Sequence, residues 1–379
     1  MEEEKKPKKK IGLIISLSLV VIIIIAIVSA IIWYTNSIKA VSDNPNEEKF
    51  MVEIPKDTSI SGIGEILKKN GLIKDDFAYK VFCKLYGFDN VMAGKYELSK
   101  NMSLTEIAEI LEKGPDLKKY EINITFKEGT CIRKMAALLE EKTNIKADDF
   151  LAKMKDRDYI KTLIPNYWFL EGLPVDEEQI YYPLEGYLFP DTYTFTDKDV
   201  SIETVVEKML TLMGQKLEPY KEQIKQSEFK SLHAIITLAS IVELESTSGN
   251  VVGMNISSRD GVASVFYNRL KTGMSLGSDV TTYYAIQKDM HDYELRMSDL
   301  NSKNGYNTRA SGMEGKIPVG PICSPSIQSI IASIKPQSSE YYFFVADKNG
   351  DTYLTKTNAE HNAIIKKLQA EGMWYTYDN

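Results

Sequence analysis

A run of 23 residues without a single charge, IGLIISLSLVVIIIIAIVSAIIW, occupies residues 11–33. An α-helix rises about 1.5 Å per residue, so a run of this length crosses a hydrocarbon core of about 30 Å. A segment this apolar is poorly suited to the surface of a soluble domain. We therefore predict a transmembrane helix over residues 11–34, and the rest of the chain has to fold outside the bilayer.

The flanks of this segment predict its orientation. Five lysines stand in MEEEKKPKKK, residues 1–10, whereas the other end carries Trp33 and a single lysine, Lys39. Because lysines are retained on the cytoplasmic side, we expect a cytoplasmic tail and a single-pass protein of the cell membrane with an extracytoplasmic main part. A cleaved signal peptide is the alternative, since VSA at residues 28–30 resembles a cleavage site. In either case the remainder is exported.

The charge and the scattered ligand-type residues exclude several classes of function. The chain has 46 basic and 53 acidic residues and a formal net charge of −7. Binding of nucleic acid requires a basic face, so we expect no nucleic-acid partner. The cysteines and histidines are dispersed: Cys83, Cys131 and Cys323, and His233, His291 and His361. This spacing predicts neither a disulfide framework nor a metal site, and we expect no cofactor.

An internal repeat organises the region after the apolar segment. Residues 35–49 are polar and turn-rich and predict a linker. Residues 54–77 then align with residues 125–150 if the second copy contains two single-residue insertions, and each copy predicts a strand, a turn and an amphipathic helix. We predict small α+β units over residues 50–115 and 116–175. Such units usually bind or position a ligand, and a plain spacer is the alternative.

The character of the chain changes in its last part, which we predict to be a separate domain over residues 176–379. Aromatic residues, prolines and glycines gather in YYPLEGYLFPDTYTF, and helical patterns follow at residues 201–226 and 230–246. The segment YYFFVADKNGDTYLT predicts a β-hairpin. The predicted fold class is therefore α+β, with an N-terminal transmembrane helix, small α+β units and a mainly helical domain that ends in a hairpin.

Two glutamates follow the apolar run LASIV at the end of the helix predicted over residues 230–246. Glu243 and Glu245 are about 200° apart at roughly 100° per residue, so they cannot share a face. Glu243 lies along the row of small residues that includes Ser240. We expect Glu243 at the edge of an apolar pocket, where desolvation raises its pKa and lets it donate a proton near neutral pH. A structural ion pair with an arginine such as Arg259 is the alternative.

Seven segments resemble, in the same order, the conserved blocks of the MltG/YceG-like endolytic murein transglycosylases. They are LEGYLFPDTY (184–193), LASIVELES (238–246), ASVFYNRL (263–270), LGSDVTTYYA (276–285), YNTR (306–309), IPVGPICSPS (317–326) and YYFFVADKNGDTYLTKTNAEHN (341–362). The resemblance implies that residues 50–115 form a LysM-like module and that residues 176–379 form the catalytic domain. It places the catalytic glutamate directly after Ala-Ser-Ile-Val, at Glu243.

The resemblance also implies the reaction. The family cleaves the β-1,4 bond between N-acetylmuramic acid and N-acetylglucosamine inside a peptidoglycan glycan strand and leaves a 1,6-anhydro end. One glutamate suffices as acid and then base, because the C6 hydroxyl of the muramyl sugar replaces the water of an ordinary glycosidase. No cofactor or metal is implied. The implied partners are peptidoglycan glycan strands, penicillin-binding synthases and proteins of division or elongation.

Supporting roles in substrate binding or around the cleft are implied for further residues, and structural hydrogen bonding is the alternative for each. They are Glu185, Tyr187, Asp191, Asn268, Asp279, Tyr306 and Asn307. Five positions depart from the family pattern that the resemblance implies: Leu244 replaces a basic residue, Gly277 a glutamine, Val280 a proline, Arg309 a tyrosine and Val319 a proline. These departures predict an altered rate. They also raise the competing hypothesis of a weak or inactive homologue that binds glycan strands and scaffolds cell-wall synthesis proteins.

Overall fold

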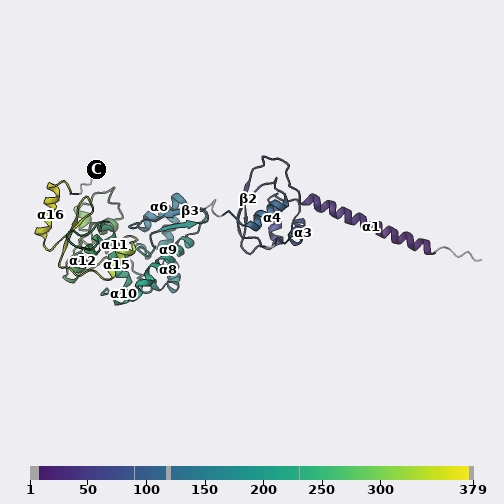
Figure 1. The fold of residues 1–379 in the computed structure, drawn as a ribbon. Coiled ribbons are helices and arrows are strands. Elements are labelled where there is room, and N and C mark those ends of the chain that lie inside the picture. The colour runs from purple at the N-terminus through teal and green to yellow at the C-terminus, as the bar shows by residue number, and fades with distance from the viewer. Residues whose placement is uncertain (1–7, 89, 117–120, 230, 375–379) are drawn as a thin grey trace, which may run out of the picture. The chain divides into compact units, whose positions relative to one another are not determined.

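The computed structural model describes residues 8–88, 90–116, 121–229 and 231–374 (Figure 1). Most of the tail predicted at residues 1–10, and residue 230 at the start of a predicted helix, lie outside these ranges. The chain divides into two compact units, Met1–Lys119 and Tyr120–Asn379. The prediction of a mixed, mainly helical α+β fold with small hairpins and one apolar N-terminal helix is confirmed.

The apolar segment forms one continuous helix, α1 (Lys8–Ser37). Its part from Ile14 to Ser37 is long and apolar enough to cross a membrane, and none of the apolar window is buried against the protein. The side chains of Ile14 and Leu17, for example, are 64% and 66% exposed. Length and composition alone allow either a membrane anchor or a signal sequence.

A small α+β module follows in the first unit. Its elements are β1 (Phe50–Ile54), α2 (Ile60–Lys69), α3 (Asp76–Tyr86), β2 (Gly94–Leu98) and α4 (Leu104–Lys113). The two strands pair antiparallel, with Val52 opposite Tyr96. Each helix begins at a side-chain cap, and Ser103 with Glu106 forms a full capping box at the start of α4. The amphipathic helices bury their apolar faces against the hairpin. This burial is why the apolar residues recur at helical spacing in the sequence.

The second unit begins with the same order of elements. They are β3 (Ile122–Thr125), α6 (Ile132–Lys142), α7 (Ala147–Lys155), β4 (Thr192–Phe195) and α9 (Ile202–Leu217). Strand β3 pairs antiparallel with β4, as β1 pairs with β2. The duplication therefore extends beyond the segments aligned in the sequence to a complete strand–helix–helix–strand–helix unit. In this second repeat, residues 156–191 separate α7 from β4, and they contain α8 (Arg157–Leu163) and two short 3₁₀ turns, η1 (Ile164–Asn166) and η2 (Trp168–Leu170).

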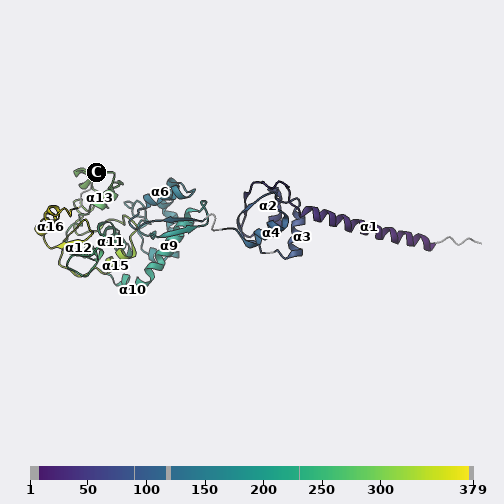
Figure 2. The same ribbon diagram turned by 45° about the horizontal axis from the view of Figure 1, so that its top comes forward.

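The remaining elements form the helical end of the second unit (Figure 2). They are η3 (Glu218–Tyr220), α10 (Lys221–Gln226), α11 (Leu232–Glu245), α12 (Ser258–Lys271), α13 (Asp279–Ala285), α14 (Met297–Leu300), α15 (Ile327–Ile334), β5 (Phe343–Ala346), β6 (Thr352–Thr355) and α16 (Asn358–Ala370). The predicted hairpin is present as β5 and β6, and Asp347 closes its turn by accepting the amides of Asn349 and Asp351.

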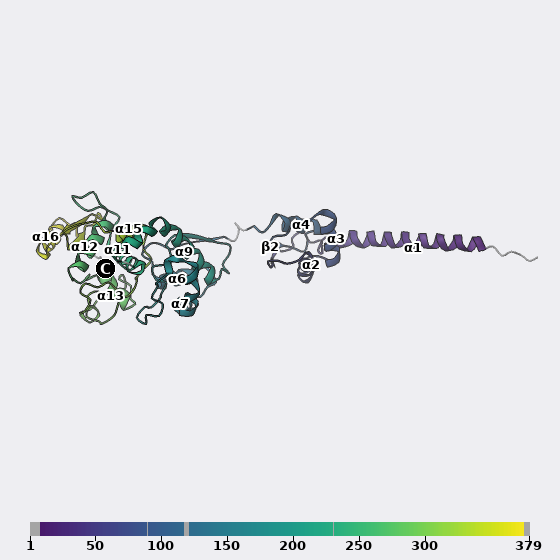
Figure 3. The ribbon, with the colours of Figure 1, turned by 90° about the horizontal axis from the view of Figure 1, so that it is seen from below.

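Helix α11 lies at the centre of this end, because every residue from 235 to 242 is buried. It packs against α12 and α15, and Figures 1, 2 and 3 agree that these three helices lie together, away from α6 and α9. One hydrophobic core nevertheless runs through the unit: Ile124 of β3, Phe150 of α7, Ile235 of α11 and Ile330 of α15 all belong to it. Residues 122–175 thus share their core with the helical part.

Candidate active site at the end of helix α11

Helix α11 ends with both glutamates of the LASIVELES segment in its last turn. Ser231 precedes the helix and caps it, because its hydroxyl accepts a hydrogen bond from the amide of Ala234, and Ser246 follows the last helical residue. Leu244, between the two glutamates, is 38% exposed. Because the glutamates are two residues apart on a helix, their side chains enter different surroundings, as the sequence predicts. Glu243 turns toward α12 and α15, and Glu245 toward the start of α13.

Glu243 is held by four donors and is only 6% exposed. Its Oε2 accepts hydrogen bonds from the amide and the hydroxyl of Ser326, at 2.9 and 2.5 Å, and from the hydroxyl of Ser329, at 2.6 Å. Its Oε1 lies 3.2 Å from Nη2 of Arg259. Burial alone would raise the pKa of Glu243, but the serine hydrogen bonds and the Arg259 charge lower it below its ordinary value.

The expected rise in the pKa of Glu243 is therefore wrong in direction. The sequence shows the apolar residues that surround this carboxyl, but it does not show that Ser326 begins α15 and directs its amide at the same group. The structure realises the alternative interpretation, an ion pair with Arg259. In this arrangement Glu243 connects α11, α12 and α15 as an ionised group.

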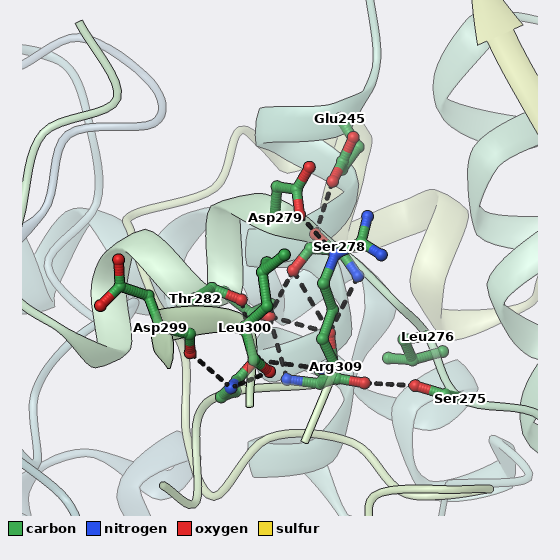
Figure 4. Close-up of polar contacts among 12 residues, drawn as sticks. Glu245, Ser275, Leu276, Ser278, Asp279, Thr282, Asp299, Leu300 and Arg309 are labelled. Atoms are coloured by element: carbon green, nitrogen blue, oxygen red, sulfur yellow. Dashed lines mark hydrogen bonds and ion pairs between the residues drawn. The ribbon is translucent and has the colours of Figure 1, made fainter. Parts of the chain in front are cut away.

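Glu245 has the opposite electrostatic setting (Figure 4). It is half-buried, and burial is the main cause that raises its pKa, with the neighbouring Asp279 acting in the same direction. The hydroxyl of Ser278 donates to Oε1 of Glu245 over 2.5 Å and opposes this rise, as do the charges of Arg309 and Arg269. No hydrogen bond from the described part of the chain reaches Oε2. Glu245 is thus a carboxyl with a raised pKa, and one of its oxygens accepts no hydrogen bond from the described residues.

A network of short polar side chains holds Ser278 in place. Its amide donates to the hydroxyl of Thr308 at 3.0 Å, and that hydroxyl lies 2.8 Å from the hydroxyl of Thr281. Asp279, the first residue of α13, forms an ion pair with Arg309. Figure 4 shows the guanidinium of Arg309 reaching up beside Asp279 and Ser278, below Glu245. The start of α13 and the YNTR segment therefore form one side of the site.

Asn307 organises the YNTR segment from inside the protein. Its Nδ2 donates to the carbonyl oxygens of Asp299, Leu300 and Ser302, and its Oδ1 accepts from the hydroxyl of Thr282 and from the amide of Arg309. Because Asn307 is fully buried and uses both ends of its amide, it acts on the site by positioning Arg309 and α13.

Three of the residues expected to take part in substrate binding or the cleft lie in the interior. Glu185 is fully buried, accepts hydrogen bonds from the amide of Ile132 at 3.0 Å and the hydroxyl of Tyr284 at 2.9 Å, and burial raises its pKa to about 8. The ring of Tyr306 packs 4.8 Å from that of Tyr284. Tyr187 is 1% exposed, and its hydroxyl lies 3.1 Å from Nδ1 of His233.

The last two expected residues, Asn268 and Asp191, make no contact with the Glu245 network among the described residues. Asn268 on α12 donates to the carbonyl oxygens of Ser339 and Tyr341, both at 2.9 Å, and so holds the segment that leads into β5. Asp191 is exposed at the start of β4 and lines two grooves, of about 630 and 300 Å³. Of the seven expected residues, Asp279 and Asn307 are the two that the structure connects to the Glu245 network.

Sequence reasoning missed three contributors to this network, Ser278, Thr281 and Thr308. All three lie inside quoted motifs, LGSDVTTYYA and YNTR, but a hydroxyl residue carries no pattern that distinguishes a site from a turn. As for metals, the described residues contain no group of three His, Cys, Asp or Glu side chains arranged to hold an ion, and the three cysteines are buried free thiols.

Comparison with known proteins identifies one family and several relatives of this chain. A model of the YceG-like family matches residues 52–367. The endolytic murein transglycosylase of Bacillus subtilis strain 168 is 34% identical over 334 residues, which cover 88% of this chain and 89% of that protein. The protein of the same name from Streptococcus pneumoniae serotype 2 strain D39 is 32% identical, and the match covers 84% of this chain but 58% of the relative.

A solved structure extends the similarity to the fold. The crystal structure of a yceG-like protein from Listeria monocytogenes aligns with a TM-score of 0.57 and 31% sequence identity. The alignment covers 84% of this chain and 100% of that chain.

Proposed function

Because this chain belongs to the YceG-like family, we propose that it is a membrane-anchored endolytic lytic transglycosylase of peptidoglycan. It cleaves the β-1,4 bond between N-acetylmuramic acid and N-acetylglucosamine within a glycan strand and leaves a 1,6-anhydro end. The homology to the Bacillus subtilis endolytic murein transglycosylase, which spans 89% of that relative, supports the reaction class. The carboxyl of Glu245, with its raised pKa and its available oxygen, is the observation that carries the chemistry.

We assign the acid and base role to Glu245. A general acid has to hold its proton near the working pH and to reach the leaving oxygen. Burial raises the pKa of Glu245, whereas the four donors around Glu243 lower the pKa of that carboxyl. A substrate would have to displace Ser326, Ser329 or Arg259 to reach Glu243. The initial preference for Glu243 remains a rival hypothesis that the same experiment tests.

The reaction then proceeds in two balanced steps. Glu245 donates its proton to the glycosidic oxygen, the bond from C1 of the muramyl sugar to that oxygen breaks, and the bonding electrons leave with the N-acetylglucosamine hydroxyl. The C6 hydroxyl oxygen of the muramyl sugar attacks C1 and forms the anhydro ring, and its proton returns to the Glu245 carboxylate. Because the acceptor belongs to the substrate, a second catalytic carboxylate and an activated water are not needed.

The deciding experiment compares three full-length proteins in detergent on purified glycan strands, with mass spectrometry of the products. The parent and the Glu243→Gln variant should release anhydro-ended fragments, and the Glu245→Gln variant should release none. A folded Glu243→Gln variant without activity, beside an active Glu245→Gln variant, would reverse the assignment. A parent that binds the strands and leaves them intact would favour the scaffold hypothesis raised by the departures at Leu244, Gly277, Val280 and Arg309.

We further propose that α1 (Lys8–Ser37) anchors the protein, with its amino terminus in the cytoplasm, and that the module at residues 50–115 is LysM-like and holds glycan. Penicillin-binding synthases and division or elongation proteins are the proposed partners. The mass of the protein extracted from membranes tests the anchor. Retention of the helix gives the full 42.9 kDa, whereas cleavage after Ala30 removes the first 30 residues.

A further inference from the structure

We propose that Arg309 binds a carboxylate carried by the muramyl sugar when a glycan strand lies against Glu245. The proposal rests on the proposed function and adds a specificity-determining subsite to it. Arg309 ends the YNTR segment, at a position where the resemblance noted in the sequence implies a tyrosine. A guanidinium in place of a phenol changes both the charge and the donor geometry of the site.

The side chain of Arg309 is anchored at one end and accessible at the other. Its amide donates to Oδ1 of Asn307 at 3.1 Å, and its Nε pairs with Asp279. The side chain is nevertheless 40% exposed. Neither of its two Nη atoms donates a hydrogen bond to another described residue. An arginine that is oriented by its backbone and by Nε, with both terminal nitrogens available, suits bidentate binding of a carboxylate.

The charged groups around the site have a net positive charge that favours binding of an anion. Arg309 and Arg269 both act electrostatically on Glu245, and Asp279 is the neighbouring acidic group that opposes them. When Glu245 carries the proton that it needs as an acid, these four groups sum to one positive charge. An anion that approaches Arg309 then neutralises this excess and also disfavours ionisation of Glu245, which preserves its acid form.

The substrate supplies the anion on one of its two sugars. N-acetylglucosamine is neutral, whereas muramic acid carries a lactyl ether that ends in a carboxyl group. On strands without peptide this carboxyl is free, and on peptide-bearing strands it is an amide while the peptide contributes carboxylates farther out. Both sources present the same chemistry to a guanidinium. A subsite of this kind orients the strand, because it distinguishes the muramyl from the glucosaminyl position next to the acid.

The test measures binding, so that it does not depend on turnover. Full-length protein with Glu245→Gln, in detergent, is titrated calorimetrically with four ligands. These are a peptide-free muramyl-containing tetrasaccharide, the same compound with its lactyl carboxyls converted to methylamides, the peptide-bearing tetrasaccharide, and the tetramer of N-acetylglucosamine. The same titrations are repeated with Arg309→Gln, with Arg309→Lys, and with Lys316→Gln as a control for loss of one exposed positive charge in the same loop.

The expected result is a loss of about tenfold in affinity for a carboxylate ligand with Arg309→Gln, partial rescue by Arg309→Lys, and no change for the methylamide or the N-acetylglucosamine tetramer. Sensitivity of the peptide-free ligand identifies the lactyl group as the source, and sensitivity restricted to the peptide-bearing ligand identifies the peptide. Equal losses for all four ligands, no loss for any, or no binding of either carboxylate ligand to the parent would overturn the proposal. If the protein with Glu245 intact releases anhydro products but Arg309→Gln does not change ligand binding, the subsite is wrong and the activity stands. If Arg309→Gln weakens binding of a carboxylate ligand but the protein with Glu245 intact releases no anhydro products, the activity is wrong and the subsite stands.

Discussion

The hydroxyl of Ser278 donates a hydrogen bond to Glu245 over 2.5 Å and thereby joins the start of α13 to the last turn of α11. Two residues earlier on the same turn, Glu243 accepts from Ser326 and Ser329 at the start of α15. Glu243 is 6% exposed and Glu245 is half-buried, and the pKa of Glu245 is raised whereas that of Glu243 is lowered. For Glu243, three hydrogen bonds and Arg259 outweigh the effect of burial. For Glu245, burial and the charge of Asp279 outweigh one hydrogen bond and the charges of Arg309 and Arg269.

Substitution of Ser278 by alanine should move the pH dependence of catalysis. The Ser278 hydroxyl stabilises the ionised form of Glu245, so its loss raises the pKa of Glu245 further and the alkaline limb of the pH–rate profile moves to higher pH. We expect kcat to fall about tenfold, because one hydrogen bond that orients the acid is lost. Ser275→Ala is the matched control, since the Ser275 hydroxyl donates to the carbonyl of Thr308 and not to Glu245. An unchanged alkaline limb would show that Ser278 does not act on Glu245 as the proposed acid.

Glu243→Ala should destabilise the second unit. The substitution leaves Ser326, Ser329 and Arg259 without their common acceptor in a site where Glu243 is 6% exposed. The expected loss in the free energy of unfolding is about 3 kcal/mol, by denaturant titration. Glu222→Ala, in a pair with Lys225 where Glu222 is 73% exposed, should leave the free energy of unfolding close to that of the parent, because solvent screens an exposed ion pair. Equal costs for the two variants would contradict the structural role of Glu243.

Glu185 should make the protein less stable at alkaline pH. Burial raises its pKa from 4.5 to about 8, so between these values the folded chain keeps a proton that the unfolded chain releases. Stability from this group is complete below about pH 4.5 and is lost as the pH rises through about 8, by an amount on the order of 2–5 kcal/mol. Glu185→Gln should flatten the fall in Tm between pH 5 and about pH 9. If parent and variant lose Tm in parallel, the buried carboxyl is not the cause.

Gly186 and Gly172 have almost the same backbone angle, so alanine substitutions at the two positions separate the cost of backbone strain from the cost of side-chain packing. Gly186 has φ +81° and Gly172 has φ +79°. A Cβ at Gly186 would lie 2.6 Å from Pro321 and 2.8 Å from Ile236, whereas a Cβ at Gly172 meets no atom within 4 Å. Alanine at either position should cost about 1 kcal/mol for the left-handed backbone. At Gly186 the contacts add about 1–3 kcal/mol, which Tm measurements of both variants can detect. Equal shifts would show that the loop around Gly186 moves to accommodate the methyl group.

Local patterns predicted much of the fold because their causes are local. The uncharged run gives α1, and the spacing of Ile63 and Leu67, or of Met135 and Leu139, gives α2 and α6. The repeat in the sequence appears as two copies of the same strand and helix order. The sequence did not predict that β4 and α9 complete the second copy of the repeat. Residues 156–191 separate them from α7, and the pairing of β3 with β4 depends on residues far apart in the chain.

The sequence predicts two carboxyls in the last turn of one buried helix, but not the groups that surround each of them. The apolar run of α11 and the angle between Glu243 and Glu245 follow from composition and from the helical repeat, so the sequence alone determines that two carboxyls leave a buried helix in different directions. Tertiary structure decides which of them has the lowered pKa and which the raised pKa. The start of α15 directs Ser326 at Glu243, and the start of α13 directs Ser278 at Glu245. A pKa depends on every dipole and charge within a few ångströms, and residues 16 to 86 positions away supply them here.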